Sequence, residues 1–75
     1  MDERQVCIAL GKRIRELRES MNISQQELAD RCNFETSNMS RIESGRTNPT
    51  AITLFKISSA LNTSMSRITS AVDSE

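Results

Sequence analysis

The side chains in this chain that could do chemistry together lie mainly in one short segment, residues 36–41. Thr36, Ser37 and Asn38 are short hydrogen-bonding residues, and Arg41 places a guanidinium about one helical turn further on. Hydroxyl, amide and guanidinium groups donate and accept hydrogen bonds, which suits the binding of another molecule. The segment therefore predicts a binding surface rather than a catalytic site.

Catalytic groups and metal ligands are scarce elsewhere. The sequence has no histidine, no cluster of carboxylates and no glycine-rich phosphate-binding loop. Its two cysteines, Cys7 and Cys32, have no neighbouring base and no partner at the spacing of a zinc site. We therefore expect no enzyme, no metal, no cofactor and no small-molecule ligand. Both thiols are expected to be reduced, with Cys32 as a small core residue.

A chain of 75 residues forms one small domain with a thin core, because so short a chain buries only about 60% of the surface exposed on unfolding. Its apolar stretches are far shorter than the roughly 20 residues that a membrane-spanning helix needs. No signal peptide is visible. We expect a single domain over residues 1–75, in the cytoplasm and away from membranes.

The charge balance counts against a nucleic-acid partner, but its distribution weakens that objection. Ten basic and ten acidic side chains give a net charge of zero, whereas DNA-binding domains usually carry a basic surplus. The charge of one face matters more than the total. The basic residues gather in the first segment and around the end of the polar segment: Arg4, Lys12, Arg13, Arg15, Arg18, Arg41 and Arg46. We interpret the run 12–18 as a solvated helix face rather than as a stripe that binds DNA.

The segment 24–45 has the form of two short amphipathic helices joined by a tight turn. Ser24 begins the first helix, and Glu27 completes a capping box in which the hydroxyl and the carboxylate each accept a backbone N–H. Asn33 makes the turn, since asparagine tolerates the left-handed conformation. This arrangement is a helix-turn-helix, which places one exposed helix face where it can enter the major groove of DNA.

The second of these helices is expected over about residues 36–44, with Gly45 ending it. Met39 and Ile42 face the core. Glu35 stands at the N-cap, where a carboxylate can satisfy free N–H groups and the helix dipole. It could instead accept a hydrogen bond from cytosine N4, and the sequence leaves these two roles open.

Three further helices complete the expected fold. An apolar stripe at helical spacing marks the first, which Gly11 weakens slightly and Asn22 ends. Thr50 and Ser64 cap the fourth and fifth helices, and residues 72–75 are expected to fray. The expected core positions of these helices and of the one after Ser24 are Val6, Leu10, Ile14, Leu17, Met21, Leu28, Ala29, Cys32, Leu54, Ile57, Leu61, Met65, Ile68 and Val72. The sequence therefore predicts a compact all-α domain of five helices.

Several motifs resemble the lambda-repressor/Cro-like helix-turn-helix family, also called the xenobiotic response element family, over about residues 14–68. They are IRELR at 14–18, SQQELA at 24–29, SRIESGR at 40–46, NPT at 48–50, LFKI at 54–57 and Ala60-Leu61. Each motif is weak alone, but their order and spacing together are specific. The resemblance implies a lambda-repressor-like domain whose second and third helices form the helix-turn-helix.

The resemblance makes the helix at 36–44 the recognition helix. Its base-reading positions would be Thr36, Ser37, Asn38 and Arg41. A guanidinium can pair with O6 and N7 of guanine, an amide suits adenine, and hydroxyls bond a base edge or a phosphate. These side chains would therefore read the sequence of double-stranded DNA.

The resemblance also implies roles outside the reading face. Gln25, Ser44 and Arg46 match positions that approach DNA phosphates. Arg18 and Glu43 match a structural ion pair that ties the first helix to the third. If that pair is buried, the loss of either partner leaves a lone charge in the interior.

The chain departs from the family pattern at four positions. Asn33 replaces a glycine in the turn, and Glu35 replaces a serine or threonine. Ala51 and Thr63 stand where larger apolar residues are usual. The last two thin the core near the fourth and fifth helices, through which a homodimer is expected to form.

The resulting hypothesis is a transcriptional regulator that binds a palindromic operator as a homodimer, because one short reading helix makes few base contacts. Restriction–modification controllers and small phage repressors are family members of this size. The alternative is an antitoxin-like protein-interaction module with the same fold, which the zero net charge and Glu35 favour. The operator, the regulated genes and the choice between repression and activation stay open.

Overall fold

The structure is a computed structural model that describes residues 1–72. Its helices are α1 (Glu3–Ser20), α2 (Gln25–Cys32), α3 (Thr36–Glu43), α4 (Ala51–Ala60) and α5 (Met65–Thr69), followed by a 3-10 turn, η1 (Ser70–Val72). No strand occurs in this part of the chain. The expected compact all-α domain of five helices is confirmed.

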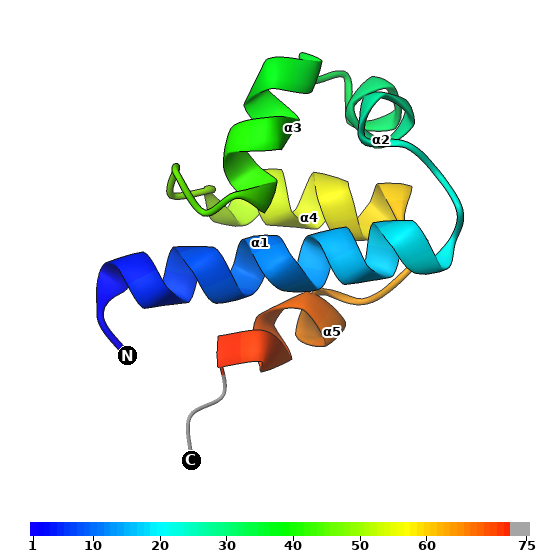
Figure 1. Cartoon of the computed structure of the whole chain (residues 1–75). Coiled ribbons are helices and arrows are strands. Elements are labelled where there is room, and N and C mark those ends of the chain that lie inside the picture. The colour runs from blue at the N-terminus through cyan, green and yellow to red at the C-terminus, as the bar shows by residue number, and fades with distance from the viewer. Residues whose placement is uncertain (73–75) are drawn as a thin grey trace.

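α1 is the longest helix and runs across the middle of the molecule (Figure 1). It packs against α3 on one side and against α5 and η1 on the other. α2 packs against α3 and α4, and α4 packs against α5. α2 and α3 therefore lie together on the side of α1 opposite α5, as Figure 1 shows.

The core lies where these helices meet, and it consists mostly of the residues that the apolar stripes predicted. Its buried members are Leu10, Ile14, Leu28, Ala29, Cys32, Met39, Ile42, Leu54, Ile57, Leu61 and Ile68. Val6, Leu17, Met65 and Val72 pack against them as partly buried residues. Cys32 is a core residue as expected, and burial raises the pKa of its thiol.

The prediction of Met21 as a core residue is wrong. Its side chain is 39% exposed, because α1 ends at Ser20 and Met21 already has a non-helical conformation at the C-cap. Asn22 follows with a φ of 59°. The chain then turns inward, and Ile23 takes the place against the core that the stripe assigned to Met21.

Four helices end in the same way, with a residue in the left-handed conformation that glycine and asparagine tolerate best. The φ angles are 59° at Asn22, 60° at Asn33, 78° at Gly45 and 54° at Asn62. After α3, the N–H of Arg46 donates to the carbonyl of Arg41 at 2.9 Å. The predicted stops at Asn22, Asn33 and Gly45 are confirmed, and the stop at Gly45 fixes Arg46 directly behind the end of α3.

The serine and threonine caps are also confirmed. The hydroxyls of Ser24, Thr50 and Ser64 each accept from the backbone N–H three residues later. The second half of the capping box at Ser24 is wrong, because the Glu27 carboxylate forms an ion pair with Arg31 at 2.8 Å instead. A guanidinium at i+4 offers a charged donor on the helix surface, which competes with the neutral N–H.

Glu35 was predicted to cap α3 through its carboxylate, and the hydrogen bond in that prediction is wrong. Glu35 occupies the N-cap of α3, but its side chain makes no cap hydrogen bond. Glutamate is one methylene longer than the residues that cap well, so its carboxylate does not fold back onto the first turn as easily. The carboxylate stays exposed at the N-terminal end of α3.

Gly11 has a packing role that the sequence pattern did not reveal. A Cβ at this position would lie 2.4 Å from the carbonyl oxygen of Ile42 and 2.6 Å from that of Glu43. The absence of a side chain lets α1 lie directly against the C-terminal end of α3. Gly11 therefore sets how closely α3 packs against α1.

The described part of the chain ends at Val72. The predicted frayed segment, residues 72–75, lies outside the described residues except for Val72. That residue belongs to η1 and packs against the core. None of the described helices has the length and apolar character to cross a membrane.

Candidate nucleic-acid interface

The outer face of α3 presents the predicted base-reading residues to solvent. Thr36, Ser37 and Arg41 are exposed, and Asn38 is half-buried. The opposite face is anchored by Met39, which is 0% exposed. No hydrogen bond or ion pair holds the Arg41 guanidinium within the described residues. The four side chains share one helix and are free to meet a ligand.

The predicted phosphate contacts lie beside this face. A surface pocket of about 510 Å³ brings together Gln25 from the first turn of α2 and Ser44 from the end of α3. Arg15, Ser24 and Ser40 line the same pocket and were not assigned a role from sequence. Donors from three helices therefore converge at one place.

Arg18 and Glu43 also line this pocket, and the pair is buried as expected. Two parallel hydrogen bonds join the side chains, Nε to Oε2 at 2.8 Å and Nη2 to Oε1 at 3.1 Å. The guanidinium also donates to the carbonyl of Ile23 at 2.9 Å. The hydrogen bond to Glu43 raises the pKa of Arg18. The pair links α1, α3 and the α1–α2 connection.

Gln25 is tied to this ion pair. Its Nε2 donates to Oε1 of Glu43 at 3.1 Å, and the side chain is half-buried. Sequence reasoning missed this bond, because Gln25 and Glu43 are 18 residues apart and belong to different motifs. The bond fixes the amide at the mouth of the pocket, with its oxygen and second N–H still available.

The basic run 12–18 has mixed roles. Arg15 pairs with Glu19 on the exposed face of α1, at 3.4 Å. Arg13 donates to the carbonyl of Arg67 at 2.7 Å and to the Ser70 hydroxyl at 3.1 Å. The prediction of a solvated face is therefore wrong for Arg13, because its guanidinium satisfies the carbonyl end of α5. It is also wrong for Arg18, which is buried in the ion pair with Glu43.

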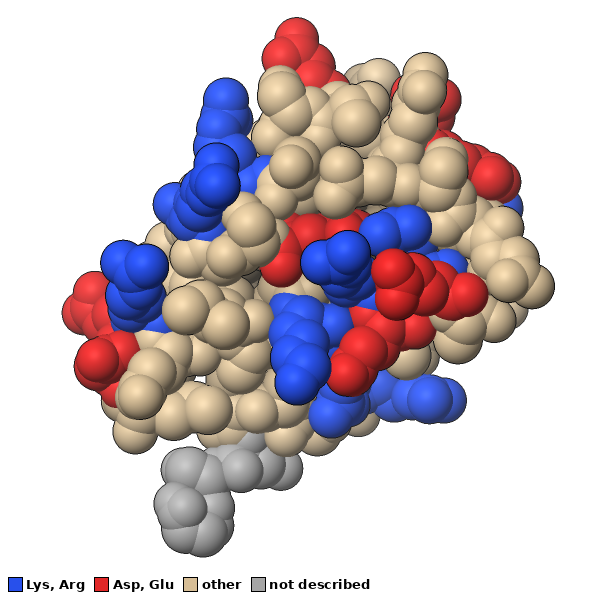
Figure 2. All heavy atoms as spheres, in the orientation of Figure 1, with Lys and Arg blue, Asp and Glu red and all other residues tan. Residues whose placement is uncertain are grey.

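The surface charge differs between α3 and α1. Figure 2 shows basic side chains at the upper left, over α3 and the loop that follows, without acidic groups between them, whereas acidic groups lie further down the left edge, over the start of α1. Over the middle of α1 the two signs are interspersed. The basic residues of α3 and that loop are Arg41 and Arg46. The neutral chain thus carries positive charge beside α3.

An apolar patch lies on α4. Ile52 is 65% exposed and Phe55 is 57% exposed. On α5, by contrast, Ile68 is buried and Met65 packs against the chain's own core. The exposed apolar surface of this end of the domain is therefore on α4.

Comparisons with known proteins agree with this geometry. A family model described as helix-turn-helix matches residues 14–68. An uncharacterized HTH-type transcriptional regulator, y4dJ of Sinorhizobium fredii, is 33% identical over 64 residues, which cover 85% of this chain and 83% of that protein. The HTH-type transcriptional regulator ImmR of Bacillus subtilis is 35% identical over 57 residues, 76% of this chain but only 45% of ImmR.

Solved structures show the same fold. The restriction-modification controller C.AhdI of Aeromonas hydrophila superposes with a TM-score of 0.81 at 27% identity, covering 83% of this chain and 94% of that one. A transcriptional regulator of the same family from Vibrio cholerae superposes with a TM-score of 0.87 at 25% identity, covering 95% of this chain and 40% of that one. The lambda-repressor-like resemblance is confirmed. The chain belongs to the helix-turn-helix family of DNA-binding transcriptional regulators.

Proposed function

We propose that the protein binds double-stranded DNA sequence-specifically, as a homodimer on a palindromic operator, and regulates transcription there. The observation that carries this proposal is the position of α3. Its outer face holds exposed polar side chains next to a positive edge, and its inner face is anchored in the core. Because the target is DNA, we propose the cytoplasm as its place of action.

The reading roles follow from the chemistry of each side chain. Arg41 would donate to O6 and N7 of guanine, and Asn38 would pair with adenine. Thr36 and Ser37 would bond base edges or the adjacent phosphate. Glu35 makes no cap hydrogen bond, which supports a role as acceptor from cytosine N4.

The phosphate roles rest on the pocket between the first turn of α2 and the C-terminal end of α3. Gln25 and Ser44 both line it, and the bond to Glu43 holds the Gln25 amide in place. Arg46 follows directly behind α3. Amide, hydroxyl and guanidinium donors of this kind fix a helix-turn-helix on the DNA backbone without reading its sequence.

The dimer is supported by the apolar patch on α4. The expectation from sequence was an interface of α4 and α5. Of these two helices, α4 carries the large exposed apolar side chains, Ile52 and Phe55. Ile52→Asp is expected to shift the protein to monomers in sedimentation velocity while its melting temperature changes little. Gln26→Asp, which adds the same charge at an exposed position of α2 away from this patch, is the control. A monomeric wild-type protein would contradict the proposed dimer.

The decisive experiment is selection of bound duplexes from a random pool. The proposal predicts enrichment of an inverted repeat whose half-sites are centred about one helical turn apart, 34–36 Å. An enriched sequence without two-fold symmetry would contradict the homodimer. Failure to enrich any sequence would contradict sequence-specific binding. The similarity to C.AhdI, of which this chain covers 94%, supports a controller or small repressor.

A protein-interaction module is the second candidate, and the exposed Ile52 and Phe55 with the zero net charge favour it. The two functions differ in their salt dependence. DNA binding that releases counterions weakens steeply as salt rises. A module of the antitoxin type would need a protein partner and would bind duplexes weakly whatever their sequence.

A further inference from the structure

The loop between α3 and α4 crosses α1 near the N-terminal end of that helix. The backbone of Gly45 lies directly on α1, since a Cβ there would stand 2.7 Å from the Cα of Ile8. Arg4 precedes Ile8 by four residues, so the two side chains share one face of α1. Arg4 therefore lies beside the loop that carries Arg46.

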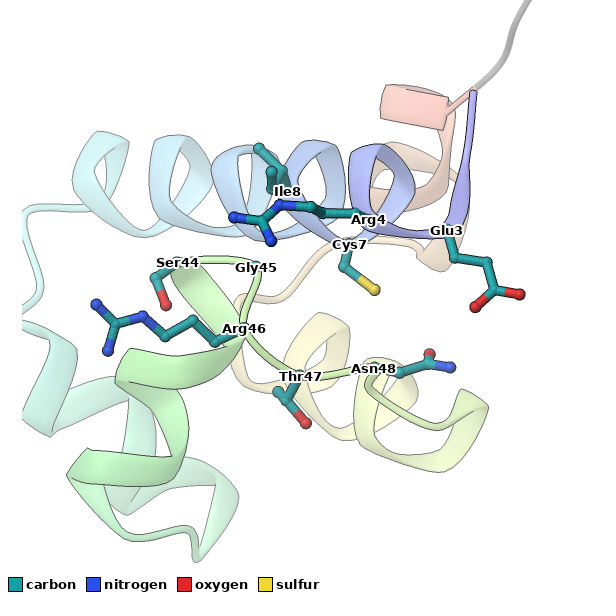
Figure 3. Close-up of a pocket in the computed structure, with 9 residues that line it drawn as sticks. All are labelled: Glu3, Arg4, Cys7, Ile8, Ser44, Gly45, Arg46, Thr47 and Asn48. Carbon is teal, nitrogen blue, oxygen red and sulfur yellow. The ribbon is translucent and has the colours of Figure 1, made fainter.

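A surface pocket of about 520 Å³ opens at this crossing. Arg4 and Arg46 are both among its lining residues, with Ser44, Thr47 and Asn48. Figure 3 shows the two guanidinium groups extending to the same side of the crossing, with the Ser44 hydroxyl between them. Glu3, which also lines the pocket, extends to the opposite side.

The two arginines have no counter-charge of their own. Both side chains are exposed, and neither makes a hydrogen bond or ion pair within the described residues. Two guanidinium groups on one side of a pocket repel each other weakly, and an anion between them removes that repulsion. Guanidinium forks match the oxygens of a phosphate. The Ser44 hydroxyl donates to the carbonyl of Arg41 at 3.1 Å, so it would reach a phosphate by rotating away from that carbonyl.

We propose that Arg4 joins Arg46 and Ser44 in binding a phosphate of the DNA backbone, an inference that rests on the proposed DNA-binding function. Ser44 lines both this pocket and the one that holds Gln25, so the two phosphate sites are continuous along the edge of α3. Arg4 lies outside the residues 14–68 that the family model matches. The N-terminal turns of α1 thereby extend the DNA contact beyond the helix-turn-helix.

The test compares Arg4→Gln with Arg67→Gln. Both changes remove one exposed positive charge, but Arg67 lies on α5, on the other side of α1 from α3. The probes are a labelled duplex selected from a random pool by the wild-type protein and a shuffled duplex of the same length. Binding is measured by fluorescence anisotropy at several salt concentrations.

Arg4→Gln is expected to weaken binding to both duplexes by a similar factor, about threefold to tenfold near 0.1 M salt. It should also reduce the slope of log K against log salt by about one per bound chain. Arg4→Lys, which keeps the charge, should restore most of the slope. Arg67→Gln should leave both quantities close to the wild-type values.

Equal effects of Arg4→Gln and Arg67→Gln would overturn the role of Arg4 and leave the proposed function intact. If Arg4→Gln weakened binding to the selected duplex but not to the shuffled one, the role of Arg4 would also be overturned, since a phosphate contact carries no sequence information. A wild-type protein that selects no duplex would overturn the proposed function and this site together. Circular dichroism of each variant separates these outcomes from unfolding.

Discussion

The C-terminal end and the outer face of α3 both carry polar side chains, and they differ in whether the protein itself supplies hydrogen-bond partners for them. At its C-terminal end, Glu43 is buried and bonded to Arg18 and to Gln25. On its outer face, Arg41 and the residues before it are exposed or half-buried, and the described residues provide no partner for the Arg41 guanidinium. The first group fixes the helix to the domain, and the second is left for a ligand.

This difference separates stability from recognition on a helix of eight residues. A buried ion pair is costly to break, because the remaining charge loses both its partner and water. An exposed polar residue contributes little to folding, since water satisfies it in both states. Substitutions at the two ends of α3 should therefore change different measured quantities.

The largest expected effect is at Glu43. Glu43→Ala leaves Arg18 buried at 9% exposure without its carboxylate and should reduce the free energy of unfolding by about 3–5 kcal/mol. Glu19→Ala, which removes an exposed carboxylate 3.9 Å from the same guanidinium, should cost less than about 1 kcal/mol. Chemical denaturation measures both. Similar losses for the two variants would show that the buried pair has no special role.

Gly11→Ala tests how the helix is seated. The new Cβ would contact two carbonyl oxygens at the end of α3, and such overpacking costs about 1–3 kcal/mol. This cost opposes the gain of about 1 kcal/mol that alanine brings to a helix. Lys12→Ala, at the next and exposed position of α1, is the control. A melting temperature above that of the wild type would contradict close packing at Gly11.

Arg41→Ala tests the outer face. We expect a loss of about 1–3 kcal/mol in binding to the selected operator, concentrated at one base pair of each half-site. Stability should change by less than about 0.5 kcal/mol, since Arg41 is exposed. Competition with operators mutated at single positions measures the preference. Equal weakening on every duplex would remove Arg41 from the base-reading residues.

Gln25→Ala tests a residue that contacts both regions, because its side chain bonds to the buried pair and lines the pocket beside the outer face. It should weaken binding to all duplexes about equally, by about 1 kcal/mol, as a phosphate contact does. Gln26→Ala, at the next and exposed position of α2, is the control. A change of sequence preference in Gln25→Ala would show that the residue reads bases.

Much of the local structure follows from short stretches of sequence. Ser24, Thr50 and Ser64 begin helices because their hydroxyls accept an N–H within the first turn. Asn33 ends α2 because it tolerates a positive φ. These interactions join residues at most a few positions apart, so the residue types and their spacing were enough to predict them.

The site was predictable only in part. The Arg18–Glu43 pair was inferred from the family resemblance and is confirmed by its geometry. The base and phosphate contacts stay predictions, now with positions in space. Met21 was placed wrongly because the apolar stripe was extended past the end of α1 at Ser20. The carboxylate of Glu27 was placed wrongly because Arg31, one turn later, competes for it.

The sequence by itself determined the five helices, their stops and the apolar faces, since each depends on neighbours along the chain. Only the tertiary structure decided which distant groups meet. Gly11 seats α3 on α1, Glu43 holds the amide of Gln25, and Gly45 brings Arg46 beside Arg4. These contacts join residues far apart in the sequence, and they depend on how closely two helix backbones approach, which no local preference encodes.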